Sequence, residues 1–349
     1  RSGRELLDEM GMTLYGLKQE IGAEAFAERL DQAALMAIQD QNAAGIDFVT
    51  DGEERRGHYV LYVLRRLAGI DFERLTEKPI REGRYVRRLP TVVDEIAYRG
   101  PILVDDFKFT RQHTTAIPKI GLPGPSTVVD SVADSYYQGN RERMARDYAL
   151  AIRQEVENLI QAGCQAIQFD DPVLLRYPDQ AKQWGLAALQ SCFVGLEDRA
   201  TFFVHICRGY PDKPLEQEGI AYKANAGYYE DVLGWLSDST IDVVSIDGAQ
   251  SEPSGNYASS VAPSECGLDL AVLPAIGEKT VMLGVLDVGS DQVESVEVLV
   301  RRGREALRYL PREQLILAPD CGMLQLSREA AKEKLANLAR AAQELNRPE

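Results

Sequence analysis

Short apolar runs alternate along this chain with long segments of helical periodicity, and this alternation restricts the possible folds more than any other feature. Strands that alternate with helices form a parallel sheet whose faces the helices cover. The predicted strands are residues 46–49, 118–121, 166–169, 202–205, 242–246, 281–285 and 315–318. The main predicted helices are residues 24–44, 140–162, 226–237, 291–309 and 327–345. The sequence therefore predicts an α/β protein with a parallel sheet.

A chain of 349 residues is long enough for one (β/α)8 barrel of the TIM type, so we predict a single barrel domain over residues 1–349. The seven predicted strands are one fewer than this barrel needs. Either the eighth strand lies within residues 98–106, or it precedes residue 1, because the chain opens directly on a helix predicted for residues 5–17.

Residues 65–117 are rich in arginine and β-forming residues, and they predict a hairpin-like excursion rather than part of the barrel. Its expected extended segments are Tyr85-Val86, Thr91-Val92-Val93 and Ile102-Leu103-Val104.

Charge and composition narrow the classes of partner. The net charge of −15 speaks against nucleic acid and anionic membrane surfaces, so we expect small-molecule partners. No apolar run approaches the ~20 residues that span a bilayer, and no signal peptide opens the sequence. Five cysteines without a disulfide-like spacing favour a reducing, cytoplasmic location, and Cys164, Cys192 and Cys266 are expected to be core or surface thiols. A homo-oligomer is compatible with these properties.

His205 and Cys207 close one predicted strand, and Cys321 follows another, at residues 315–318. Residues i and i+2 of a strand point to the same face, so an imidazole and a thiol would emerge side by side. Taken singly, each is more often a buried core residue. Together, one nitrogen and two sulfur ligands can occupy three corners of a zinc tetrahedron, and an exchangeable position beside them is typical of catalytic zinc. The pattern predicts a zinc site.

Acidic residues follow most of the predicted strands. A single aspartate before a helix is more often an N-cap or turn residue than a functional group. As a set, however, these acids would gather at the carboxyl ends of the strands, where barrels carry their active sites. The acids are Asp51, Glu53, Asp170, Asp171, Asp247, Asp287 and Asp320.

These residues carry a resemblance to a known family. The chain resembles the catalytic barrel of the cobalamin-independent methionine synthase family, within the uroporphyrinogen-decarboxylase-like superfamily, as a single-barrel member. The similar segments occur in family order along nearly the whole chain. They are Thr50-Asp51-Gly52-Glu53, Gly124-Pro125-Ser126-Thr127, Ile167-Gln168-Phe169-Asp170-Asp171-Pro172, His205-Ile206-Cys207, Asp242-Val243-Val244-Ser245-Ile246-Asp247, Gly284-Val285-Leu286-Asp287 and Pro319-Asp320-Cys321-Gly322.

The resemblance implies roles for the matched positions. His205, Cys207 and Cys321 would hold zinc. Asp247 stands where the family has a glutamate ligand, and Glu252 is a nearby substitute. Glu53 and Asp170 would hold the amino group of homocysteine, with Asp171 as a further substrate-binding residue. Asp287 is the candidate catalytic acid.

Three departures from the family pattern concern the first strand and the substrates. The Ile-Gly-Ser loop of the family's first strand is absent, which favours a strand missing before residue 1. The aromatic residue that flanks the folate is not found near Ser131. Gly289 stands where the family has a histidine that helps to protonate the folate leaving group. The last two departures speak against methyltetrahydrofolate as the methyl donor.

The expected activity is zinc-dependent alkyl transfer to a thiol. A free thiol has a pKa of ~8.5, and binding to zinc deprotonates it, so the sulfur becomes a nucleophile at neutral pH. Methyl transfer to homocysteine or a related thiol is the first reading. The second resembles epoxyalkane:coenzyme M transferase, whose sulfonate substrate would need cations. Arg55, Arg56 and Arg208 are the candidates, unless they are solvated surface charges. A zinc-dependent thiol-binding protein without catalysis is the reading from another class.

Overall fold

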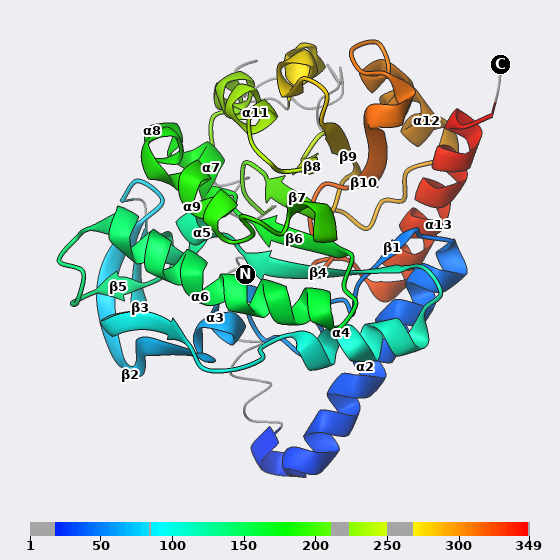
Figure 1. Cartoon of the computed structure of the whole chain (residues 1–349). Coiled ribbons are helices and arrows are strands. Elements are labelled where there is room, and N and C mark those ends of the chain that lie inside the picture. Colours follow the sequence, from blue (N-terminus) through cyan, green and yellow to red (C-terminus); the bar gives the residue numbers. More distant parts are fainter. Residues whose placement is uncertain (1–17, 84, 211–222, 250–267, 348–349) are drawn as a thin grey trace. The chain divides into compact units, whose positions relative to one another are not determined.

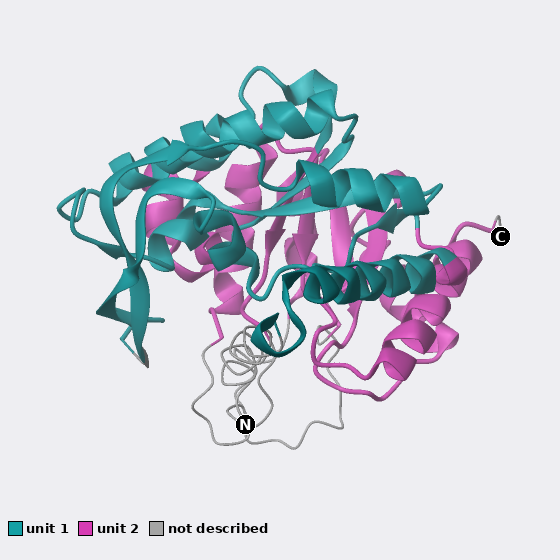
Figure 2. Ribbon diagram, turned by 90° about the horizontal axis from the view of Figure 1, so that it is seen from below, with its two compact units in different colours: residues 1–42, 47–171, 187–201 teal, residues 43–46, 172–186, 202–349 magenta. Residues whose placement is uncertain are grey.

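The structure is a computed structural model that describes residues 18–83, 85–210, 223–249 and 268–347. The chain forms two compact units (Figure 2). Unit 1 comprises residues 1–42, 47–171 and 187–201, and unit 2 comprises residues 43–46, 172–186 and 202–349. The predicted helix 5–17, Glu252 and Cys266 lie outside the described residues. A single domain over residues 1–349 stays a prediction.

Unit 1 contains three parallel strands, β1 (Phe48–Val49), β4 (Ile117–Pro123) and β6 (Ala166–Asp170), which are hydrogen-bonded in that order (Figure 1). Each lies at a predicted apolar run. The helical segments that accompany them are α2 (Ala23–Ala44), α3 (Tyr59–Leu64), α4 (Val104–His113), α5 (Pro125–Asp130), α6 (Arg141–Gln161), α9 (Leu186–Ser191) and η2 (Glu197–Arg199).

The two longer strands of unit 1 have two chemically different faces. On one face, Ile120, Leu122, Ile167 and Phe169 are buried, and the Phe169 ring packs on the Phe193 ring with centroids 5.8 Å apart. The opposite face carries residues that are only half-buried. These are Lys119 and Gly121 of β4 and Gln168 and Asp170 of β6. Because side chains alternate along a strand, this second face collects the polar groups of the unit.

The predicted excursion is confirmed as a three-stranded sheet in unit 1, formed by β2 (Leu67–Ile80), β3 (Tyr85–Tyr98) and β5 (Ala133–Asp134). The long strands β2 and β3 are antiparallel, and β5 runs parallel to β3 (Figure 1). Lys78 of β2 donates to the carbonyls of Val129, Asp130 and Val132 at 2.9, 3.1 and 2.9 Å. These carbonyls lie at the end of α5, so the excursion satisfies that helix end.

The expected extended segment at residues 102–104 is not formed, because α4 begins at Val104. The buried carboxylate of Glu155 accepts hydrogen bonds from the backbone nitrogens of Ile102 and Leu103, at 2.9 and 2.6 Å. A carboxylate at a helix N-terminus satisfies free amides and stabilises the helix dipole. Residues 99–106 therefore contain no eighth strand.

Unit 2 contains four parallel strands, β7 (Thr201–Ile206), β8 (Val243–Ile246), β9 (Thr280–Leu286) and β10 (Leu315–Pro319), paired in that order. All four residues of β8 are buried, as expected of a parallel strand covered on both faces. The helical segments of this unit are α7 (Val173–Arg176), α8 (Pro178–Gln180), η1 (Ala181–Gly185), η3 (Ala226–Tyr228), α11 (Tyr229–Ser237), η5 (Leu270–Ile276), α12 (Val296–Ala306), η6 (Arg312–Gln314) and α13 (Arg328–Leu345).

All seven predicted parallel strands are present, and the described residues hold no further parallel barrel strand. Helices α12 and α13 begin where serines cap them: Ser295 and Ser327 accept from the backbone nitrogens of Val298 and Ala330. The predicted helix 291–309 is therefore shorter than expected at its start. Within the described ranges, no helix combines the length and the apolar character that crossing a membrane requires.

Candidate functional site

The predicted metal ligands come together in unit 2. One donor atom each of His205, Cys207 and Cys321 lies within 4.8 Å of the other two. His205 is on β7, Cys207 follows that strand directly, and Cys321 follows β10. His205 and Cys207 are buried at 7% and 5% exposure, and the His205 Nδ1 lies 3.1 Å from the Ser245 hydroxyl. An imidazole nitrogen and two sulfurs are the donor types that zinc prefers, so these residues fit that ion.

The environment of Cys207 favours its thiolate. A hydrogen bond from Cys321 is the largest cause that lowers the pKa of Cys207 well below its usual value, and His205 lowers it further. Burial and the charge of Asp247 act in the opposite direction. A thiolate, rather than a thiol, is the form that binds metal.

Asp247 is not a member of this three-residue cluster. It accepts hydrogen bonds from the Tyr229 hydroxyl and from the backbone nitrogen and Nε of Arg208, the last two at 3.3 and 3.4 Å. Tyr229 is fully buried and Arg208 is 5% exposed. The carboxylate is thus held beside the cluster by neighbouring donors, which is the usual place of a residue that orients ligands from outside.

Asp320 links two loops at the same end of unit 2. Its Oδ1 accepts from the backbone nitrogens of Gly248 and Ala249, at 2.9 and 2.8 Å. Burial raises the pKa of Asp320 to about 7, and the charges of Asp247 and Asp287 act in the same direction. This side chain fixes the segment before Cys321 to the segment after β8.

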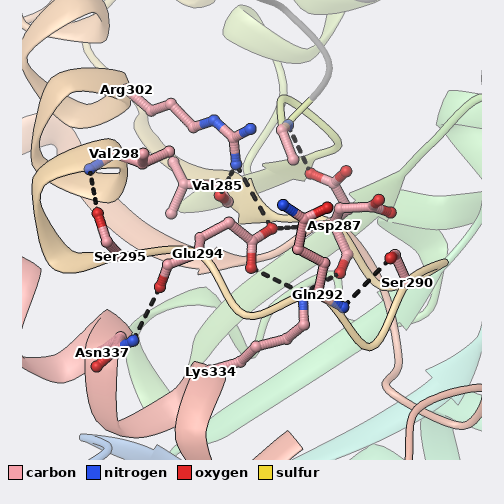
Figure 3. A network of polar contacts seen from close by, with 12 residues as sticks. Val285, Asp287, Ser290, Gln292, Glu294, Ser295, Val298, Arg302, Lys334 and Asn337 are labelled. Atoms are coloured by element: carbon pink, nitrogen blue, oxygen red, sulfur yellow. Dashed lines mark hydrogen bonds and ion pairs between the residues drawn. The ribbon is translucent and has the colours of Figure 1, made fainter. Parts of the chain in front are cut away.

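The side chain of Asp287, the candidate catalytic acid, accepts from the Gly289 nitrogen at 2.8 Å. The ion pair of Glu294 and Lys334 is hydrogen-bonded to the Asp287 backbone (Figure 3). The Asp287 nitrogen donates to Glu294 Oε1 at 2.8 Å, and Lys334 Nζ donates to the Asp287 carbonyl at 2.9 Å and to Glu294 Oε2 at 2.7 Å. Arg302 adds a hydrogen bond to the Val285 carbonyl at 2.6 Å. Lys334 is fully buried, and its ammonium group is ion-paired with Glu294.

In unit 1, Glu53 and Asp170 approach one glycine. A methyl group placed on Gly121 would lie 3.1 Å from Asp170 Oδ2 and 3.2 Å from Glu53 Oε1. The two carboxylates therefore face the same small space, which Gly121 keeps open. Two carboxylate oxygens around one space suit a cation such as an ammonium group.

Glu53 has an unusual backbone and a perturbed acidity. Its φ is +57°, in the left-handed region, and its carboxylate accepts from Arg56 Nη1 at 2.8 Å. Desolvation raises the pKa of Glu53 to about 7; Arg56 opposes this, whereas the charges of Asp170 and Asp51 add to it.

Asp171 lies behind this face. It is fully buried, and its carboxylate accepts from the Thr127 nitrogen and hydroxyl at 2.7 and 2.8 Å and from the Ser126 nitrogen at 3.1 Å. Burial raises its pKa to about 6, although these donors lower it. The predicted substrate contact of Asp171 is thus replaced by a structural one: it holds the N-terminus of α5.

The three arginines proposed for anion binding are already paired with acids. Arg55 donates to Asp31 at 2.7 and 2.9 Å. Arg56 binds Glu53, and Arg208 binds Asp247. The alternative of solvated surface charges is also wrong for Arg56 and Arg208, which are 8% and 5% exposed. A sulfonate would have to compete with a carboxylate at each of them.

Sequence reasoning missed two polar residues on the inner strands of unit 1. Lys119 Nζ donates to Gln168 Oε1 at 2.8 Å, and Gln168 Nε2 donates to Asp170 Oδ1 at 2.7 Å. The available signal was a lysine and a glutamine inside apolar strands at alternate positions to the core residues. At the departure sites, Ser131 is the C-cap residue of α5, and the Gly289 nitrogen donates to Asp287 Oδ1. Neither residue supplies an aromatic ring or an imidazole.

Known proteins resemble this chain over most of its length. Residues 13–344 match the family model described as "Cobalamin-independent synthase, Catalytic domain". A methionine synthase of Saccharolobus solfataricus is 31% identical over 318 residues, which cover 90% of this chain and 84% of the relative. A methionine synthase of Thermococcus kodakarensis is 26% identical over 340 residues, covering 96% of this chain and 89% of that protein.

Solved structures agree. A B12-independent methionine synthase from Shewanella sp. W3-18-1, in complex with selenomethionine, superposes with a TM-score of 0.79 at 32% identity, covering 92% of this chain and 89% of that chain. A putative vitamin-B12 independent methionine synthase from Listeria monocytogenes gives 0.71 at 18% identity, covering 98% and 94%, and shares the fold. The predicted barrel-type α/β fold is confirmed.

Proposed function

Because the chain belongs to the cobalamin-independent synthase family by its catalytic domain, we propose that it transfers a methyl group to the thiol of homocysteine, forming methionine. The cluster of His205, Cys207 and Cys321 is the observation that carries the proposal, because it provides the donor set of a catalytic zinc site. Zinc bound there would supply the Lewis acidity that turns an incoming thiol into a thiolate at neutral pH.

The remaining residues have roles of their own in this proposal. Glu53 and Asp170 bind the ammonium group of homocysteine. We assign to Asp287, whose backbone is hydrogen-bonded to Glu294 and Lys334, the exchange of a proton as the methyl donor leaves. Asp247 stays with Tyr229 and Arg208 and steadies the loop that carries Cys207.

Two observations make the epoxide reaction on coenzyme M the weaker candidate. Arg55, Arg56 and Arg208 are engaged by carboxylates, so a sulfonate finds no ready cation among them. The space at Gly121 is bordered by two acids, which attract an ammonium group and repel a sulfonate.

The test combines proton release with product formation. Homocysteine should release about one proton more than methionine when each binds the zinc-loaded protein at neutral pH, because only homocysteine has a thiol that binds as the thiolate. Calorimetry in buffers of different ionisation enthalpy measures this number. Methionine formed from homocysteine and a methyl donor supports the proposal. An alkylated coenzyme M formed from a small epoxide, without any methionine, contradicts it.

Methionine binding should tighten as the pH rises through about 7, because Glu53 has a raised pKa in the folded protein. Below that pKa the carboxyl is protonated and cannot pair with an ammonium group; above it the carboxylate can. Between about pH 6 and pH 8 the dissociation constant should fall by at most about tenfold. Methionine is chosen because its sulfur does not titrate. The Glu53→Gln variant should bind weakly at both pH values; an unchanged pH dependence in that variant would exclude Glu53 as its source.

A further inference from the structure

We propose that Lys119 and Gln168 are positioning residues for amine recognition: they form a relay that fixes the Asp170 carboxylate toward the amino group of the substrate. This proposal rests on the proposed function and extends it to two residues outside the matched ligand and acid set. All the groups involved lie in unit 1, on the half-buried face of β4 and β6.

Strand register places the relay. Gly121 is paired with Gln168, and Lys119 is paired with Ala166, in the parallel ladder of β4 and β6. Residues i and i+2 of each strand share a face, so Lys119 and Gly121 stand beside Gln168 and Asp170. The four positions form a continuous strip that ends at the two carboxylates.

The hydrogen bonds along this strip run from Lys119 through Gln168 to Asp170. The Gln168 carbonyl oxygen accepts from Lys119 Nζ at 2.8 Å, which leaves its amide nitrogen to donate to Asp170 Oδ1 at 2.7 Å. Since an ammonium group can only donate, Lys119 excludes the flipped orientation of the amide. Asp170 Oδ1 then accepts the hydrogen bond from Gln168, and Asp170 Oδ2 faces the space beside Gly121.

The charges of the strip match an ammonium ligand. The pKa of Lys119 is lowered to about 8, and burial is the largest cause. The charges of Asp170 and Glu53 act in the opposite direction. Arg56 Nη1 donates to Glu53 Oε1 at 2.8 Å and to the Gly121 carbonyl at 3.0 Å. Asp170 and Glu53 thus each have a cationic neighbour, Lys119 and Arg56, and one oxygen of each carboxylate lies at the space beside Gly121. A primary amine is the group that such a pair selects.

The relay is tested by comparing a ligand that has the amine with one that lacks it. Methionine and 4-(methylsulfanyl)butanoate differ only in the amino group, and calorimetry gives both dissociation constants without turnover. In Gln168→Met, methionine affinity should fall by about 10- to 100-fold, the range expected for a hydrogen bond to a charged group, while affinity for the deaminated analogue changes less than about twofold. Lys119→Met should lose selectivity in the same direction, and Lys119→Arg should restore most of it.

A matched control and a folding control accompany the measurement. Gln165→Met alters an exposed glutamine just before β6 and should leave both affinities unchanged. Thermal unfolding shows which variants are folded, and Lys119→Arg preserves the charge if Gln168→Met is not folded. Equal losses for both ligands, or no loss for methionine, would overturn the relay. If methionine is bound selectively but never formed from homocysteine, the relay stands and the proposed function fails.

Discussion

Replacing Cys207 and Cys321 together by serine should remove zinc binding and abolish methyl transfer. The two sulfurs and His205 converge within 4.8 Å, and a serine hydroxyl is a much poorer zinc ligand than a thiolate. Since even partners outside the ligand set change metal affinity by about 10–100-fold, losing two ligands should reduce affinity by well over ~100-fold. Metal analysis after dialysis, followed by an assay of methionine formation, measures both effects.

The matched control for this experiment is Cys164→Ser. Cys164 is a buried thiol in unit 1 that contacts the Ala166 carbonyl at 3.4 Å, a contact that a serine hydroxyl can also make. This variant should retain full zinc content and activity. Full zinc content in the Cys207→Ser, Cys321→Ser protein would show that the metal binds elsewhere, and the proposed function would lose its central observation.

Lys334→Met should lower the free energy of unfolding by about 3 kcal/mol, the lower end of the cost of breaking a buried ion pair, because Arg302 still lies 3.7 Å from the Glu294 carboxylate. Lys334 is 0% exposed and lies 2.7 Å from Glu294, so methionine would fill the space but remove the shorter of the two ion pairs of that carboxylate. Urea denaturation measures the change. Lys332→Met on the same helix removes an exposed ammonium group and should alter stability by less than about 0.5 kcal/mol.

A second variant separates charge from packing. Lys334→Met combined with Glu294→Gln has no buried charge at the pair, and the glutamine oxygen can still accept from the Asp287 nitrogen. It should recover a large part of the lost stability. A double variant as unstable as Lys334→Met would mean that the methionine side chain, rather than the loss of the lysine charge beside the carboxylate, is responsible.

Most of the fold could be predicted because apolar runs mark the parallel strands directly. The start of α4 could not, because it depends on Glu155 of α6, which supplies a carboxylate to the Ile102 and Leu103 amides from a distant part of the chain. Hydrophobic periodicity describes what a segment buries, but it does not reveal which remote side chain satisfies its backbone.

The candidate site shows the same division. His205 and Cys207 could be paired from the sequence because their spacing puts them on one face of a single strand. Asp171 was misjudged because its position after a strand looks the same as that of Asp170, while the amides of Ser126 and Thr127 make it structural. The contact between Lys119 and Gln168 depends on the register of two strands, which no local pattern encodes.

The hairpin-like excursion limits how far this protein can be shortened toward a minimal barrel. Lys78 of β2 reaches three carbonyls at the end of α5, the helix whose first amides Asp171 holds. Deleting the hairpin would remove the donor that these carbonyls share. Helix α5 and the preceding Gly124 would then be held only at the N-terminus of the helix, by Asp171. The excursion is therefore an integral part of the scaffold and cannot be treated as an exchangeable insertion.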